Sequence, residues 1–119
     1  MESFSGRVVP GKRLGHALGF PTANLETDAA PARGVYAVIA TTAGGRYRAM
    51  MNVGSHPTAP EGPPTIEVYL LDFEGDLYGC EMRVDIVRFL RGERKFESLE
   101  ALRLQLERDQ AQTRAVVAL

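Results

Sequence analysis

The sequence of 119 residues has a single cysteine, no tryptophan and almost no net charge. One cysteine cannot form an internal disulfide, so the fold depends on a hydrophobic core, which a chain of this length with 45% hydrophobic residues can build. Because 14 basic residues face 15 acidic ones, no overall positive charge attracts the chain to nucleic acid. We therefore expect one globular domain covering residues 1–119 that does not bind nucleic acid.

Several familiar segments and motifs are also missing. No apolar run approaches the roughly 20 residues that span a bilayer, and the first residues carry no signal peptide pattern. The P-loop, the dinucleotide-binding glycine motif, the HExxH motif and paired CxxC motifs are absent. These absences predict a soluble, cytoplasmic protein without a membrane partner, and any bound nucleotide needs another type of site. We also expect the protein to be a monomer.

Short segments rich in β-branched and aromatic residues follow one another along most of the chain. Residues 35–40 and 46–53 flank a Gly-containing turn and predict a β-hairpin. Residues 65–73 and 81–90 predict two further strands, and residues 6–20 favour a strand followed by a glycine-rich loop. Several strands at this spacing indicate an antiparallel barrel or sandwich.

The pattern changes to that of a helix at Ser98. Ser98 is a suitable N-cap, and Glu100 lies in the first turn, where the helix dipole favours a negative charge. Leu99, Leu102 and Leu106 recur at helical spacing. We expect this leucine side of a C-terminal helix to pack on the barrel.

The segment 18–25, Leu-Gly-Phe-Pro-Thr-Ala-Asn-Leu, is the first candidate site. In an extended strand Thr22 and Asn24 point to the same side, where their neutral oxygens suit Mg²⁺. Glycines at positions 11, 15 and 19 allow backbone N–H groups to approach a phosphate closely. The alternative is an ordered turn in which Thr22 and Asn24 cap the local backbone.

Glu67 is the second candidate. Strand alternation places Ile66, Val68 and Leu70 on one face of the segment 65–73. It places Glu67 on the other face, together with Tyr69, Leu71 and Phe73. If that face is covered, desolvation raises the pKa of the Glu67 carboxyl group. The carboxylate is then a better base for the proton of an alcohol. If the face is open, Glu67 is an ordinary solvated strand residue.

Residues 88–96 form the third candidate, because basic side chains alternate with aromatic ones between the last strand and the helix. This segment could hold a planar aromatic ligand near a phosphate acceptor site. The alternative is a charged connecting segment in which two apolar side chains pack against the rest of the protein.

Taken in order, these segments resemble the riboflavin kinase (flavokinase) domain, which forms the C-terminal part of many bacterial bifunctional FAD synthetases. The matching motifs are Gly15-x-x-Leu18-Gly19-Phe20-Pro21-Thr22-Ala23-Asn24-Leu25, Gly34-Val35-Tyr36-Ala37, Asn52-Val53-Gly54-x-x-Pro57-Thr58, Ile66-Glu67-Val68, Asp72-Phe73-x-x-Asp76-Leu77-Tyr78-Gly79 and Phe89-Leu90-Arg91-x-Glu93-x-Lys95-Phe96. The resemblance implies a six-stranded antiparallel Greek-key barrel with a C-terminal helix.

The resemblance also implies an activity: Mg²⁺-dependent transfer of the γ-phosphoryl group of ATP to the ribityl 5′-hydroxyl of riboflavin, giving FMN and ADP. Glu67 then corresponds to the general base, and Thr22 and Asn24 to the Mg²⁺ ligands. The matched flavin-binding residues are Arg91, Phe96 and Tyr78. The matched ATP-binding residues are Gly11, Lys12, Gly15, His16, Gly19, Pro21, Thr22 and Asn24.

Two further hypotheses come from other functional classes. His16 stands where members of the family often carry Arg or Lys, which is compatible with a non-catalytic module that binds a flavin or nucleotide. A small barrel can also bind single-stranded nucleic acid, although no basic stripe favours that function here. The 119 residues leave no room for an adenylyltransferase domain, so we expect this chain not to make FAD.

Overall fold

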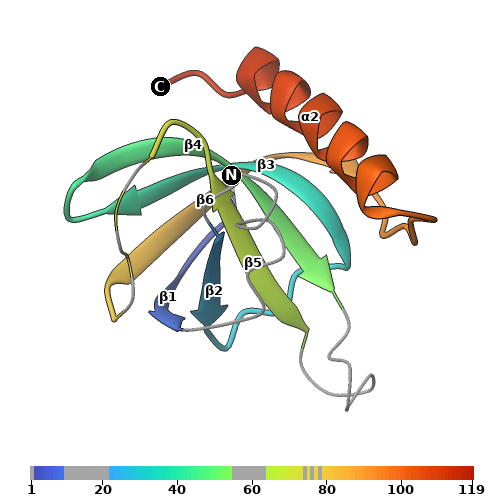
Figure 1. Cartoon of the computed structure of the whole chain (residues 1–119). Helices are drawn as coiled ribbons and strands as arrows, with labels where there is room; N and C mark the ends of the chain where they lie inside the picture. Colours follow the sequence, from blue (N-terminus) through green and yellow to red (C-terminus); the bar gives the residue numbers. More distant parts are fainter. Residues whose placement is uncertain (1, 10–21, 55–63, 74, 76, 78) are drawn as a thin grey trace.

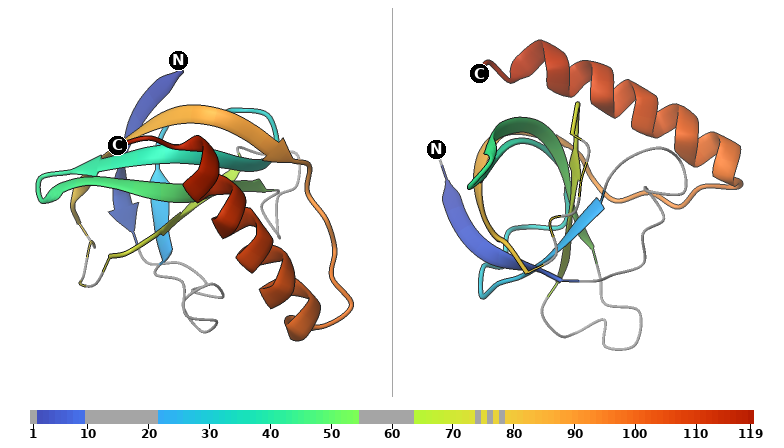
Figure 2. Two further views of the ribbon diagram at one scale, coloured as in Figure 1. Left: turned by 90° about the horizontal axis from the view of Figure 1, so that it is seen from above. Right: turned by 60° about the vertical axis from the view of Figure 1, so that its left-hand side comes forward.

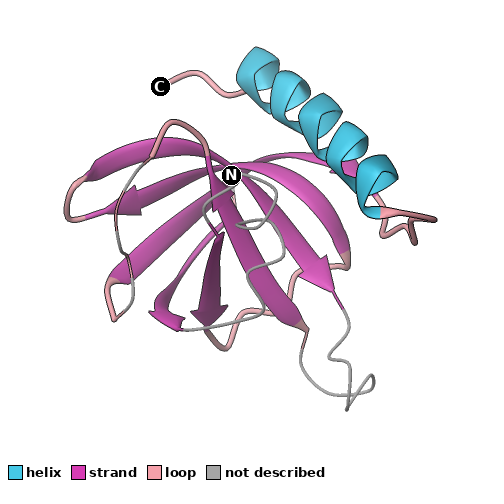
Figure 3. Ribbon diagram, viewed as in Figure 1, coloured by secondary structure: helices cyan, strands magenta, loops and turns pink. Residues whose placement is uncertain are grey.

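The computed structural model describes residues 2–9, 22–54, 64–73, 75, 77 and 79–119. Within this part of the chain, six strands form a closed barrel and one helix lies across its outside (Figure 1). Figure 3 separates the strands from the helix by colour. The elements are β1 (Ser3–Val9), β2 (Thr22–Glu26), β3 (Gly34–Thr42), β4 (Gly45–Gly54), β5 (Thr65–Leu70), β6 (Glu81–Arg91) and α2 (Leu99–Val116).

The barrel has the strand order β1-β2-β5-β4-β3-β6, and all neighbouring strands are antiparallel. Strands β3, β4 and β5 follow one another as a meander, and β2 lies beside β5, which is a Greek-key arrangement. Strands β6 and β1 close the barrel. The predicted fold class, a six-stranded antiparallel barrel with a C-terminal helix, is therefore confirmed.

Alternating residues of the strands fill the interior of the barrel. In β5 these are Ile66, Val68 and Leu70, each almost fully buried, and β4 contributes Met51 and Val53 in the same way. The predicted hairpin is confirmed, and a two-residue loop joins Thr42 of β3 to Gly45 of β4. The interior is apolar throughout this cluster, so polar chemistry has to lie on the outside of the barrel.

The helix α2 covers the outer face of β3, β4 and β6 (Figure 2). Ser98 is the N-cap, and its hydroxyl accepts a hydrogen bond from the Ala101 backbone N–H at 3.1 Å, as the sequence predicts. Leu106 is buried under the helix and Leu102 packs beside it. The expectation for Leu99 is wrong: it is 61% exposed, because the first turn of α2 extends past the edge of the barrel. Among the described residues, no helix combines the length and apolar character needed to cross a membrane.

Strand β5 ends earlier than the sequence predicts. It stops at Leu70, and Asp72 adopts a left-handed backbone conformation with φ of 58° that reverses the alternation of side chains. Phe73 therefore turns toward the barrel, where its ring meets that of Tyr47 edge-on at 5.1 Å. The prediction that Phe73 shares a face with Glu67 is wrong for this reason.

Strand β6 bends around the barrel through two register shifts against β3. One shift lies between the pairs Val35–Arg91 and Tyr36–Phe89, and such bulges change the direction in which a strand aims its side chains. Gly34 permits the close approach of the two strands here, since a Cβ at that position would lie 2.4 Å from the Phe89 ring. The bulge determines where Arg91, the last residue of β6, is placed.

Candidate active site

A cavity of about 300 Å³ lies between the outer face of the barrel and α2. Strands β3, β4 and β5 form its floor, while Arg91 at the end of β6, the connection from β6 to α2 and the helix itself form the opposite wall. The lining residues are Val35, Met50, Asn52, Glu67, Tyr69, Arg91, Glu93, Arg94, Phe96, Leu102 and Leu106. The cavity thus combines apolar walls with a few polar groups, which is the usual composition of a small-molecule site.

Polar residues meet on the three adjacent strands β2, β5 and β4, and those of β5 and β4 line this cavity. Glu67 of β5 is directly opposite Asn24 of β2 on one side and Asn52 of β4 on the other. Residues paired across a ladder project to the same side of the sheet. The outer face of the barrel therefore carries the row Asn24, Glu67 and Asn52, whose carboxylate is flanked by two carboxamides.

The neighbouring row begins with Tyr69, which is directly opposite Thr22 of β2. The Tyr69 hydroxyl donates a hydrogen bond to Glu67 Oε2 at 3.3 Å. Burial raises the pKa of Tyr69 above its usual range, the Glu67 charge raises it further, and Arg91 acts in the opposite direction. The hydroxyl accordingly stays protonated and holds one carboxylate oxygen of Glu67.

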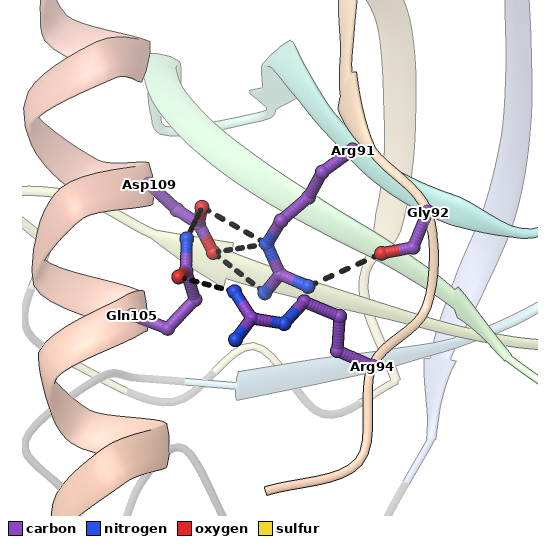
Figure 4. A network of polar contacts seen from close by, with 5 residues as sticks. All are labelled: Arg91, Gly92, Arg94, Gln105 and Asp109. Carbon is purple, nitrogen blue, oxygen red and sulfur yellow. Dashed lines mark hydrogen bonds and ion pairs between the residues drawn. The ribbon is translucent and has the colours of Figure 1, made fainter.

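Arg91 and Phe96 stand on the opposite wall. The Arg91 guanidinium contacts Asp109 of α2 through Nη2 and Oδ2 at 2.8 Å, and Nη1 donates to the carbonyl oxygen of Gly92 at 3.2 Å (Figure 4). The guanidinium carbon lies 5.7 Å from the centre of the Phe96 ring. A planar cation and an aromatic ring thus form adjacent parts of the cavity wall.

The structure brings part of the predicted site together. Glu67, Arg91 and Phe96 line one cavity, although Glu67 comes from a different segment of the chain than Arg91 and Phe96. Thr22 and Asn24 lie in strand β2, so the alternative of an ordered turn is wrong for these two residues. The predicted residues Gly11, Lys12, Gly15, His16, Gly19, Pro21 and Tyr78 lie outside the described part of the chain.

Asn52, which lines the cavity, and Asp109, which binds Arg91 of its wall, are among the residues that the sequence prediction does not name. Asn52 is a polar residue inside the apolar strand segment 49–53, and this break in the pattern was the available signal. Asp109 belongs to α2 and is almost fully buried, but its sequence position resembles that of any polar helix residue. Only the packing of α2 on the barrel distinguishes it.

Comparison with known proteins agrees with this geometry. The family model described as "Flavokinase: Riboflavin kinase" matches residues 2–117. The chain is 41% identical over 111 residues to the RNA-binding riboflavin kinase RibR of Bacillus subtilis, covering 92% of this chain and 48% of that protein. It is 42% identical over 117 residues to the bifunctional riboflavin kinase/FMN adenylyltransferase of Pseudomonas fluorescens, covering 96% and 38%.

A solved structure shares the fold. The riboflavin kinase from Trypanosoma brucei superposes with a TM-score of 0.68 at 26% identity, covering 95% of this chain and 77% of that one. The chain spans less than half the length of the two curated relatives named above. The match of the family model to nearly the whole chain, together with the barrel and its helix, shows that the chain belongs to the riboflavin kinase (flavokinase) family.

Proposed function

We propose that the chain is a riboflavin kinase that transfers the γ-phosphoryl group of ATP to the 5′-hydroxyl of riboflavin, giving FMN and ADP. The observation that carries the proposal is the position of Glu67. Its carboxylate lines a cavity with apolar walls and stands in one row with Asn24 and Asn52. A base beside a cavity that fits a planar ligand is what phosphorylation of a riboflavin hydroxyl requires.

Glu67 acts as the general base in this proposal. The oxygen of the 5′-hydroxyl forms a bond to the γ-phosphorus, and the bond from that phosphorus to the bridging oxygen of ADP breaks. The hydroxyl proton passes to Glu67. The Tyr69 hydroxyl donates to Oε2 of Glu67 and so helps to orient the carboxylate toward the cavity. Such a reaction depends on positioning and charge neutralisation more than on covalent chemistry.

Thr22 and Asn24 are the residues proposed to hold Mg²⁺. They are alternate residues of β2, and their backbone partners on β5 are Tyr69 and Glu67. Hydroxyl and carboxamide oxygens fit this hard cation, which takes its remaining ligands from phosphates and water. When bound, Mg²⁺ neutralises phosphate charge. The segment containing Gly11, Lys12, Gly15, His16, Gly19 and Pro21 leads directly into β2 and is proposed to bind the ATP phosphates.

The apolar wall is proposed to hold the flavin ring. Phe96, Leu102 and Leu106 supply that wall, and Arg91 adds a planar cation beside it. Tyr78 is included on the resemblance of its motif. With the ring under α2, the ribityl chain reaches the polar row that contains Glu67.

The test is incubation of the protein with riboflavin, ATP and Mg²⁺, followed by chromatography. We expect FMN and ADP in equal amounts and neither product when ATP or protein is omitted. Titration of riboflavin fluorescence on the same preparation measures binding separately. Quenched fluorescence without FMN would support the non-catalytic module, and no quenching would contradict both functions.

A further inference from the structure

We propose that Asp109 of α2 is a positioning residue for the riboflavin site, acting through Arg91. The inference rests on the proposed function and extends it to the helix, which sequence analysis treats only as a cover for the barrel. It concerns the wall of the cavity that faces Glu67. Three observations lead to it: the lack of regular structure in that wall, the geometry of the Arg91–Asp109 contact, and its environment.

The wall consists largely of the connection between β6 and α2, residues 92–98, which is neither helix nor strand. Regular backbone hydrogen bonds therefore do not fix its position. Side-chain contacts with α2 fix it instead (Figure 4). Arg91, at the start of the connection, binds Asp109, and Arg94 Nη1 donates to Gln105 Oε1 at 2.8 Å.

These contacts form one continuous network. Arg91 Nε donates to both carboxylate oxygens of Asp109 at 3.1 Å, while Nη2 donates to Oδ2. Gln105 Nε2 donates to Asp109 Oδ1 at 2.9 Å and so links the two arginines. Both guanidinium groups lie over the Phe96 ring, at 5.7 Å for Arg91 and 5.2 Å for Arg94. Asp109 thereby controls the position of two cations and one ring.

Because both side chains are largely buried, the Arg91–Asp109 contact restricts the orientation of Arg91. The side chains of Asp109 and Arg91 are 2% and 17% exposed. A buried ion pair contributes little net stability, because desolvation offsets the attraction, but loss of one partner leaves the other charge buried and unpaired. A fork-shaped contact also fixes the plane of the guanidinium. The pair therefore determines where Arg91 lies in the cavity.

A second ion pair on the same helix provides a matched comparison. Arg114, in the last turn of α2, contacts Asp72 after β5 through two hydrogen bonds of 2.6 and 2.9 Å. This ion pair also connects α2 to the barrel, but it is exposed, and neither of its residues lines the cavity. A role limited to docking α2 would be shared by both pairs. A role in the riboflavin site belongs to Arg91–Asp109 alone.

The experiment compares Asp109→Asn with Asp72→Asn in the intact chain, below the unfolding temperature of each variant. Asp109→Asn should raise the riboflavin KM and the riboflavin Kd from fluorescence quenching by about 10- to 100-fold, the range for a lost charged hydrogen bond. The KM for ATP should stay within about twofold, since the proposed ATP-binding residues belong to a different segment of the sequence. Asp72→Asn should leave all three constants unchanged.

If Asp109→Asn does not fold, Gln105→Met replaces it, with Gln112→Met as the control on an exposed position of α2. Gln105→Met should raise the riboflavin KM by about 5- to 10-fold, because it removes the hydrogen bonds to the Asp109 carboxylate and from the Arg94 guanidinium. Equal riboflavin constants in wild type and the folded test variant would overturn the positioning role. Absence of both FMN formation and riboflavin binding in the wild type would overturn the proposed function itself. A wild type that binds riboflavin without making FMN still tests the positioning role through Kd.

Discussion

The two faces of strand β5 have opposite chemical character. The inner face presents Ile66, Val68 and Leu70 to the apolar interior of the barrel. The outer face presents Glu67 and Tyr69 to the cavity under α2. One strand of six residues thus contributes to the core with one face and to the site with the other. We expect changes on the inner face to affect stability and changes on the outer face to affect activity.

Replacement of Glu67 by Gln should have the largest effect on activity. The amide keeps the size of the side chain but cannot take the hydroxyl proton, so kcat for FMN formation should fall by about 10²- to 10⁴-fold. The melting temperature should change little. Glu81→Gln, at an exposed position in the same barrel, is the matched control and should keep full activity. An active Glu67→Gln variant would remove Glu67 from the chemistry.

Leu70→Ala tests the inner face. Leu70 is 1% exposed, and truncation of such a side chain costs about 2–5 kcal/mol through lost burial and the remaining cavity. Denaturant unfolding should measure this loss. The kcat of the folded fraction should stay within about twofold, because the site lies on the other side of the strand. A large loss of kcat at unchanged stability would contradict the separation of the two faces.

Tyr69→Phe should have smaller effects, one on kcat and one on the loss of stability at alkaline pH. Loss of the 3.3 Å hydrogen bond to Glu67 should lower kcat a few-fold, at the modest scale of a neutral hydrogen bond. Burial raises the pKa of Tyr69 in the folded state above its ordinary value of 10.0. Its contribution to stability is therefore complete below pH 10 and lost as the pH rises further. Melting curves should show a weaker alkaline loss in Tyr69→Phe than in wild type.

Asp72→Asn should have the smallest effect. The hydrogen bond from Arg114 holds the pKa of the Asp72 carboxyl below its usual value of 3.8. A lowered pKa means that the stabilisation is present at neutral pH and is lost as the pH falls through the folded-state pKa. The small difference in melting temperature between wild type and Asp72→Asn should shrink with acid and with added salt. A difference that persists at low pH would indicate a cause other than this ion pair.

Local patterns explain how much of the fold was predictable. Alternation and turn residues identify the hairpin of β3 and β4, and the cap at Ser98 identifies the start of α2. The end of β5 was misplaced because the conformation of Asp72 is not encoded in hydrophobic alternation. Leu99 follows the helical period but lies beyond the barrel edge, and no local signal gives the position of that edge.

Several residues of the candidate site could be named from the sequence, but their arrangement could not. Thr22, Asn24 and Glu67 stand out by residue type in their segments. Their proximity depends on the pairing of β2 with β5, whose sequence separation of about forty residues leaves no local trace. Asp109 was not recognised because helical periodicity indicates which side of a helix is buried, not which charged partner lies there.

A crystal structure of the protein with riboflavin and Mg²⁺–ADP tests the central claim most directly. We predict the isoalloxazine ring between the outer face of the barrel and α2, in contact with Phe96. The 5′-hydroxyl oxygen should lie about 2.6–3.2 Å from a carboxylate oxygen of Glu67, the reach of a general base. Riboflavin bound away from this cavity, or with its 5′-hydroxyl directed away from β5, would contradict the account.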